Sequence, residues 1–268
     1  MPKVNYHTHT ARCMHAEGAD RDYVESALAG GFTTLGFSDH TPWRYAGDYV
    51  ATVRMAESEL PGYLDSIRAL KAEYAGKIEI LCGLECEYFP AYLDWLRETA
   101  RTQQLDYLIF GNHFFPSDET APYFGRSTKD AAMLRRYVDS ALLGMDCGLF
   151  SYLAHPDLFL RSYPAFDANA RAASREICRA AKRLSLPLEY NLLGARNNER
   201  YRIDGYPHEG FWRIAAEEGC TAILGVDAHI PAHLADPKYW DAALVRLRGL
   251  GIELTHTIRL RAWEDSPQ

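Results

Sequence analysis

Residues 77–111 read KIEILCGLECEYFPAYLDWLRETARTQQLDYLIFG and contain two short apolar segments on either side of a charged, helix-like one. Residues 77–85 and 105–111 have the short, apolar composition of buried strands, and residues 92–104 between them are typical of a helix. A strand, a helix and a strand joined by short connections predict two parallel strands linked by a crossover helix. The rest of the chain extends this unit.

Strand-like and helix-like segments alternate along the whole chain and make seven strand–helix units. The other strand-like segments are residues 3–7, 33–38, 148–154, 186–193, 220–226 and the marginal 252–260. The regular alternation predicts a parallel sheet, and the even spacing without a GxGxxG turn favours a closed barrel over a dinucleotide-binding sheet. We therefore expect an α/β fold, a distorted (βα)7 TIM-like barrel, with residues 1–268 in one domain.

The composition excludes several classes of protein. Of the 268 residues, 47% are hydrophobic and 24% charged, which is ordinary for a globular protein. No apolar run approaches the ~20 residues of a membrane helix, and the start MPKVNYH does not resemble a secretory signal. The net charge of −7 argues against general nucleic-acid binding, and six cysteines without a CxxC pair indicate reduced thiols. We expect a cytoplasmic protein with no membrane or nucleic-acid partner.

Every predicted strand except the marginal last one delivers a polar or metal-binding residue at its C-terminal end. In chain order these residues are His7 and His9, His40, Glu85, His113, His155, Asn191, and Asp227 with His229. In (βα) barrels the C-terminal ends of the strands carry the active site. These side chains are therefore expected to meet at one mouth of the barrel.

The spacing of these residues indicates a metal centre. Alternate residues of a strand point the same way, so the pair in HxH and the pair in DxH can each serve one cluster. Imidazole nitrogen and carboxylate oxygen suit zinc, manganese and iron. Either Glu85 or Glu87 could be the metal ligand of the third strand, because both point to the same face. We favour Glu85, because Gly83 lets the backbone approach closely just before it. Asp39 is expected to orient a ligand histidine, whereas His15 on spacing alone fits a solvated loop.

The motifs HTHT, FSDHTP, CGLECEY, IFGNHFF, AHPDL and GVDAHIP resemble, in this order, those of the PHP (polymerase and histidinol phosphatase) superfamily. The continuation HTARCMHAEG resembles the monofunctional histidinol-phosphatase branch, and the resemblance spans residues 4–231. It implies a distorted (βα)7 barrel with a trinuclear metal cluster of zinc, manganese or iron that cleaves phosphoesters. The implied metal ligands are His7, His9, His15, His40, Glu85, His113, His155, Asp227 and His229.

The resemblance also implies roles around the metals. Glu85 is expected to bridge two ions, and Asp227 or His229 to deliver a proton to the leaving group. Asn191 is expected to face the substrate, with Arg196 or Arg161 binding its phosphate. Three divalent ions of about +6, against about −3 from two carboxylates and a hydroxide, leave a charge suited to a phosphate dianion. The sequence GNH at 111–113 and the insert at 114–130 depart from the pattern of this branch.

The expected function is a metal-dependent phosphomonoesterase that hydrolyses L-histidinol phosphate to L-histidinol and phosphate, with metal-bound hydroxide as nucleophile. One alternative is a PHP phosphoesterase for another small ester or a nucleotide, of the phosphodiesterase or exonuclease type. Metal amidohydrolases also open with HxH on a barrel strand, but no lysine lies at a strand end here. A non-catalytic metal-binding protein is the remaining alternative. The oligomeric state is left open.

Overall fold

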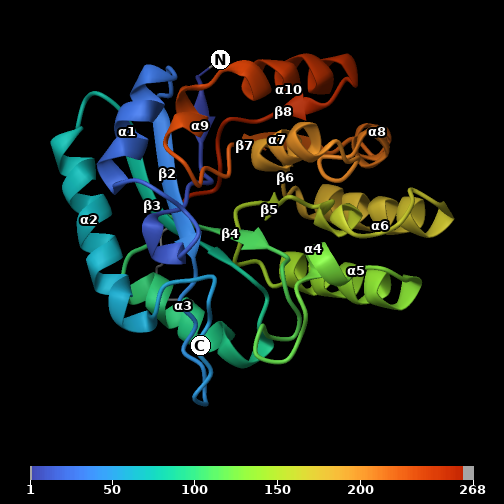
Figure 1. Ribbon diagram of the computed structural model, residues 1–268, viewed down its shortest axis with the longest axis horizontal. Helices are drawn as coiled ribbons and strands as arrows, with labels where there is room; N and C mark the ends of the chain where they lie inside the picture. Colours follow the sequence, from blue (N-terminus) through green and yellow to red (C-terminus); the bar gives the residue numbers. More distant parts are fainter. Residues whose placement is uncertain (1, 262–268) are drawn as a thin grey trace.

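The computed structural model describes residues 2–261, in which eight parallel strands form one sheet whose order follows the sequence. The strands are β1 (Val4–Asn5), β2 (Thr34–His40), β3 (Glu79–Cys86), β4 (Tyr107–Gly111), β5 (Leu153–Ala154), β6 (Leu188–Asn191), β7 (Thr221–Gly225) and β8 (Glu253–Leu254). Helices surround the strands on the outside (Figure 1). The parallel α/β fold expected from the sequence is confirmed.

Seven of the strands close the barrel, and the eighth is an addition. Beyond the end of β1, Thr8 forms a parallel bridge with Ala228, which follows β7. The backbone N–H of His9 donates to the Ala228 carbonyl at 3.0 Å, and the N–H of Ala228 donates to the His7 carbonyl at 3.2 Å. β8 pairs with β7 only through Glu253 and Leu254 at the opposite end of that strand. The result is a distorted (βα)7 barrel with a short extra strand.

Helices connect successive strands and form the outer layer. The main helices are α1 (Asp20–Ala29), α2 (Leu60–Glu73), α3 (Leu93–Thr102), α5 (Ala131–Asp146), α6 (Ala168–Leu184), α8 (Glu209–Glu217) and α10 (Lys238–Gly249). A further helix, α7 (Leu192–Tyr201), directly follows β6, and α4 (Phe124–Ser127) and α9 (Ala232–Ala235) are single turns. The 3-10 turns are η1 (Ala11–Cys13), η2 (Glu57–Glu59), η3 (Pro90–Tyr92) and η4 (Leu158–Arg161). None of the helices within residues 2–261 has the length and apolar character needed to cross a membrane.

A small apolar cluster fills the barrel below the strand ends. Its members are Val4, Tyr6, Leu81, Tyr107, Ile109, Tyr152, Ala154 and Ile223, with Ile258 packed against them. The Tyr107 hydroxyl donates to the Tyr6 carbonyl at 2.8 Å. A Cβ at Gly83 would meet this ring at 2.7 Å, so only glycine leaves room for it. Because this cluster fills the lower barrel, the polar side chains are confined to the C-terminal mouth.

Candidate metal centre

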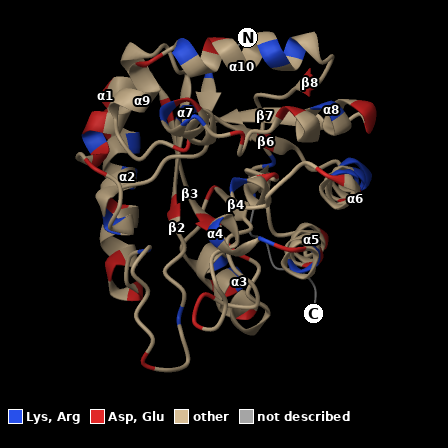
Figure 2. Ribbon diagram, turned by 45° about the vertical axis from the view of Figure 1, so that its right-hand side comes forward, with Lys and Arg blue, Asp and Glu red and all other residues tan. Residues whose placement is uncertain are grey.

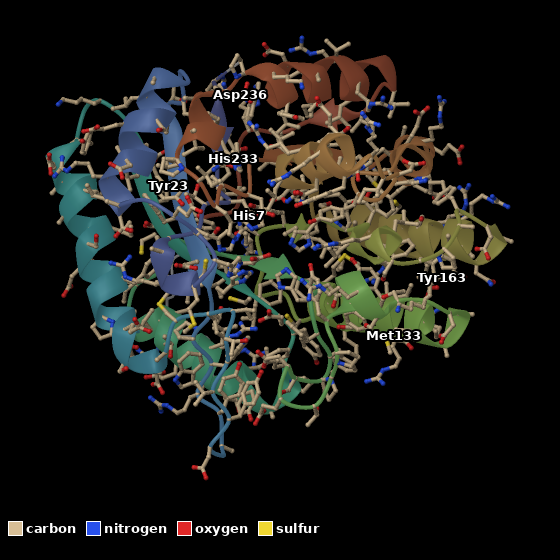
Figure 3. All side chains as sticks on the ribbon, viewed as in Figure 1. His7, Tyr23, Met133, Tyr163, His233 and Asp236 are labelled. Atoms are coloured by element: carbon tan, nitrogen blue, oxygen red, sulfur yellow. The ribbon has the colours of Figure 1, made fainter. Side chains whose placement is uncertain are left out.

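The residues expected at the strand ends come together in the structure. The Nε2 atoms of His7 and His9 are 3.1 Å apart, and those of His113 and His155 are 3.2 Å apart. Glu85 lies between these pairs, with Oε2 at 3.4 Å from His7 Nε2 and Oε1 at 3.0 Å from His155 Nε2. His7 lies near the centre of the molecule, inside the ring of strands (Figure 3). Strands β1, β3, β4 and β5 thus supply one continuous cluster.

Donor atoms form several overlapping groups within 4.8 Å of one another. Three of these groups are His7–His9–Asp227, His7–Glu85–His155 and His9–His40–His229. His15 belongs to a further group with Cys13 and His229, and its ring centre is 4.7 Å from that of His229. His15 therefore lies beside the cluster, although the residue remains exposed to solvent on its loop. Cys13 is fully buried beside it.

The geometry of these donors fits bound cations. Zinc binds imidazole nitrogen at 2.0–2.1 Å, so two nitrogens on one tetrahedral ion are about 3.3 Å apart. The observed separations of 3.1 and 3.2 Å between Nε2 atoms are close to this value. Asp227 Oδ1 and His229 Nε2 are buried without a hydrogen-bond partner. Neutral imidazoles and carboxylates also form the donor set that suits zinc, manganese and iron.

Three carboxylates hold the outer nitrogens of the ligand histidines. Glu189 Oε2 is 2.7 Å from His7 Nδ1, and Glu87 Oε1 is 3.0 Å from His113 Nδ1. Asp39 Oδ1 is 3.4 Å from His9 Nδ1, the orienting role expected for it. Such contacts fix the ring and leave Nε2 free to bind a metal.

Two of these acids have roles that the sequence analysis does not assign. Glu87, the alternative to Glu85 as the ligand of β3, instead supports the ligand histidine His113. Glu189 is not among the predicted residues, although in LEYN it alternates with Asn191 and therefore points to the same face of β6. That alternation, with an acid inside an apolar strand, is the sequence signal that identifies it.

The electrostatics of the cluster favour cations. Burial opposes ionisation of Glu85 and Asp227, but the adjacent histidines hold the pKa of both carboxyls well below the ordinary range. Burial also disfavours charge on His9, yet the adjacent carboxylates of Asp227 and Asp39 raise its pKa to about 9. Burial and the neighbouring His229 and His9 lower the pKa of His15 to about 4. Cations would therefore displace protons held between ionised carboxylates and imidazoles.

Backbone strain occurs at two of the strand ends. His155 has φ 31° and Asp227 has φ 51°, both in the left-handed region that non-glycine residues rarely adopt. Each is a proposed ligand, and each follows a strand that ends one residue or two earlier. Such strain persists only where the surroundings fix it, and it clusters at functional sites.

Asn191 does not have the substrate-facing position expected from the sequence. Its side chain is fully buried, and Nδ2 donates to Glu189 Oε1 at 2.7 Å and to Asp227 Oδ2 at 3.0 Å. Its Oδ1 accepts the N–H of Gly194 at 2.8 Å and caps α7. The helix α7 follows β6 directly, which turns the amide away from the cavity. Asn191 therefore positions Asp227.

The two arginines expected to bind phosphate differ in their position relative to the cavity. Arg161 lines a cavity of about 440 Å³ together with the clustered histidines, Tyr123 and Tyr206. Arg196 is absent from that lining, because its guanidinium donates to Asp236 Oδ2 at 2.9 Å and lies 4.2 Å from the Tyr239 ring centre. Arg196 is therefore held outside this cavity by its own ion pair, whereas Arg161 lies on the cavity wall.

Comparisons with known proteins identify the family of this chain. The PHP domain family model matches residues 5–192. A "Probable histidinol-phosphatase" of Deinococcus radiodurans is 30% identical over 237 residues, covering 85% of this chain and 86% of the relative. The histidinol-phosphatase of Bacillus subtilis is 32% identical over 254 residues, covering 85% and 94%.

A solved structure shares the whole fold. The histidinol phosphate phosphatase of Lactococcus lactis, in complex with zinc, L-histidinol and phosphate, matches with a TM-score of 0.73 at 21% sequence identity. The match covers 97% of this chain and 98% of the other. The family model alone covers more than half of the residues. The strand-end donors lie at the C-terminal mouth of the barrel, where folds of this kind carry their active sites. The chain is a member of the PHP domain family.

Proposed function

We propose that this protein is a metal-dependent phosphomonoesterase that hydrolyses L-histidinol phosphate to L-histidinol and phosphate. The observation that carries the proposal is the convergence of six strand ends and the η1 turn on one cluster of nine nitrogen and carboxylate ligands, with Arg161 on the cavity wall. The names of the B. subtilis and D. radiodurans relatives support the substrate, as do the zinc, L-histidinol and phosphate bound to the L. lactis protein.

The proposed cofactor is three divalent ions of zinc, manganese or iron. We assign them to the nine clustered ligands, which are His7, His9, His15, His40, Glu85, His113, His155, Asp227 and His229. When bound, such ions supply Lewis acidity toward the phosphate and lower the pKa of water at neutral pH. Glu85 contacts histidines from both halves of the cluster, so its carboxylate would be the ligand available to two of the ions.

The residues of the chain have distinct parts in this reaction. Arg161 would bind phosphate oxygens through charge-assisted hydrogen bonds and stabilise the charge that develops on them. The histidines around Asp227 keep its pKa low despite burial, so at neutral pH this carboxylate accepts protons or holds cations. We assign delivery of a proton to the leaving oxygen to the Asp227–His229 pair, in which His229 Nδ1 lies 3.2 Å from Asp227 Oδ1.

The state of the cysteines and the distribution of surface charge also support action on a small substrate in the cytoplasm. The six cysteines are free thiols, as expected in a reducing compartment. Basic and acidic residues are interspersed on α1, α8 and α10 (Figure 2), in contrast to the single-sign stripe typical of nucleic-acid binders. We propose that the chain acts in the cytoplasm as one hydrolase domain on small phosphate monoesters.

A phosphate-release panel tests this function. Zinc- or manganese-loaded protein is assayed with L-histidinol phosphate, other amino-alcohol phosphates, nucleoside monophosphates and a nucleotide diester. We expect kcat/KM for L-histidinol phosphate to exceed that for every other ester by at least tenfold. Turnover confined to the nucleotide diester would contradict the proposal and favour the phosphodiesterase alternative.

A further inference from the structure

Arg54 is a buried arginine in the segment between β2 and α2, with only 1% of its side chain exposed. Its guanidinium makes paired bonds to Glu87, Nη1 to Oε2 and Nη2 to Oε1, both at 3.0 Å. It also contacts Asp118 Oδ2, with Nε at 3.1 Å and Nη2 at 2.9 Å, and donates to the Thr41 carbonyl at 3.1 Å. A buried charge needs such complete pairing, and the proposed reaction does not use this one.

One side of this network leads to a proposed metal ligand. Glu87 Oε1 is bonded both to Arg54 and to His113 Nδ1, the latter at 3.0 Å. Glu87 Oε2 accepts in addition from Trp43 Nε1 at 2.9 Å. The carboxylate therefore cannot rotate without breaking several bonds, and its fixed Oε1 holds a proton on His113 Nδ1. His113 Nε2 then faces His155 Nε2, at 3.2 Å, as a free lone pair.

The other side of the network leads to the cavity wall. Asp118 belongs to the 114–130 insert, and both its carboxylate oxygens lie 2.8 Å from the Tyr45 hydroxyl. Phe114 and Tyr123 of the same insert line a cavity of about 380 Å³ next to the candidate metal centre. Its lining also includes Arg54, Glu87, His113 and Arg161. The ion pair between Asp118 and Arg54 therefore ties this wall to the residue that fixes His113.

We propose that Arg54 is a positioning residue that orients the metal ligand His113 through Glu87 and holds the insert in place through Asp118. This inference rests on the proposed metal-dependent function. The two contacts have separate effects. The bond to Glu87 controls metal affinity, because it fixes a ligand ring, whereas the bond to Asp118 controls KM, because it fixes a wall of the substrate cavity.

Substitutions on each side of Arg54 test the inference. Lysine in Arg54→Lys keeps the charge but cannot make paired bonds to Glu87 while reaching Asp118. We expect Zn²⁺ affinity, measured by competition with a chromophoric chelator, to fall about 10- to 100-fold, with KM for L-histidinol phosphate also raised. Asp118→Asn should raise KM at least threefold and leave Zn²⁺ affinity within twofold.

The control is Arg44→Lys in the same segment, because Arg44 pairs with the exposed Glu57 outside the network. It should change neither quantity. If Arg54→Lys does not fold, Glu87→Gln replaces it and should lower Zn²⁺ affinity by a similar factor. Folded Arg54→Lys or Glu87→Gln protein with Zn²⁺ affinity within twofold of the wild type overturns the inference. Zn²⁺ affinity needs no substrate, so failure to hydrolyse L-histidinol phosphate would refute the proposed function alone.

Discussion

His7 Nδ1 lies 2.7 Å from Glu189 Oε2, a contact between the end of β1 and the interior of β6, 182 residues apart in the sequence. Both side chains are fully buried. The opposite nitrogen of His7 is 3.1 Å from His9 Nε2, so Glu189 orients a ring that belongs to two of the donor groups. Barrel closure therefore places an orienting acid behind the histidine that joins two halves of the cluster.

Replacing Glu189 should weaken the metal centre without removing a ligand. Glutamine in Glu189→Gln has the same shape but lacks the charge that supports His7. We expect a 10- to 100-fold loss of Zn²⁺ affinity, the range found when partners of ligand histidines are removed. Chelator competition measures this affinity directly. The matched control is Glu79→Gln. Glu79 is the exposed first residue of β3, far from the strand ends that carry the cluster, so this variant should have wild-type Zn²⁺ affinity.

Arg161 and Arg196 should differ strongly in their effect on catalysis. Arg161→Met removes charged hydrogen bonds to the phosphate, worth about 1.5–3 kcal/mol, so kcat/KM should fall about 10- to 100-fold. Arg196→Met should change kcat/KM less than threefold, because the Arg196 guanidinium is bonded to Asp236. Steady-state kinetics with L-histidinol phosphate would measure both. A larger loss for Arg196→Met would show that its guanidinium moves into the cavity during turnover.

Metal binding should raise thermal stability markedly. Each ion that binds only the folded state at 100 times its Kd adds about 2.7 kcal/mol to the free energy of unfolding. For a chain of this length one such ion corresponds to a Tm increase of about 5–10 °C. Scanning calorimetry of chelator-treated protein with and without Zn²⁺ measures the shift. Mg²⁺, which prefers oxygen ligands, should give a smaller shift. Equal shifts for the two ions would be inconsistent with an imidazole-rich site.

Asp157 should make stability depend on pH. Burial raises the pKa of this carboxyl from 3.8 to about 7, although the N–H of His208, which donates to Oδ2 at 2.7 Å, opposes the shift. Because the folded pKa is raised, the folded state favours the protonated form. Its stabilisation is complete below about pH 4 and is lost as the pH rises through 7. A shift of this size corresponds to about 4 kcal/mol.

Asp157→Asn removes this titration and keeps the size of the side chain. In urea denaturation of metal-free protein, the free energy of unfolding of the variant relative to the wild type should increase from pH 5 to pH 8. The comparison cancels titrations common to both proteins. A relative stability that is the same at both pH values would show that Asp157 does not titrate in this range.

Most of the fold, and the meeting of the strand-end side chains at one mouth, could be predicted from the sequence. Strand-to-helix alternation is a local pattern, and the strand ends in parallel sheets must share one edge, so His7, His113 and Asp227 could be brought together without coordinates. The sequence also indicates that the last strand-like segment, residues 252–260, is marginal. In the structure it contributes only a two-residue strand outside the closed barrel.

The supporting contacts could not be predicted in the same way. Arg196 is held outside the cavity by its ion pair with Asp236. Because Asp236 lies 40 residues from Arg196 in the sequence, this pairing could not be foreseen from the local sequence. Asn191 turns from the cavity because α7 begins directly after it. The role of Arg54 has no local sequence signal, because its partners Glu87 and Asp118 come from two other segments. Such pairings depend on tertiary geometry and have no local sequence pattern.

Phosphate release from L-histidinol phosphate by chelator-treated protein, followed as Zn²⁺ or Mn²⁺ is added back, tests the central claim most directly. The account predicts negligible release without metal and a rise that saturates as the clustered histidines and carboxylates are filled. Full turnover by protein shown to be metal-free would contradict it, as would a protein that binds the ions and releases no phosphate.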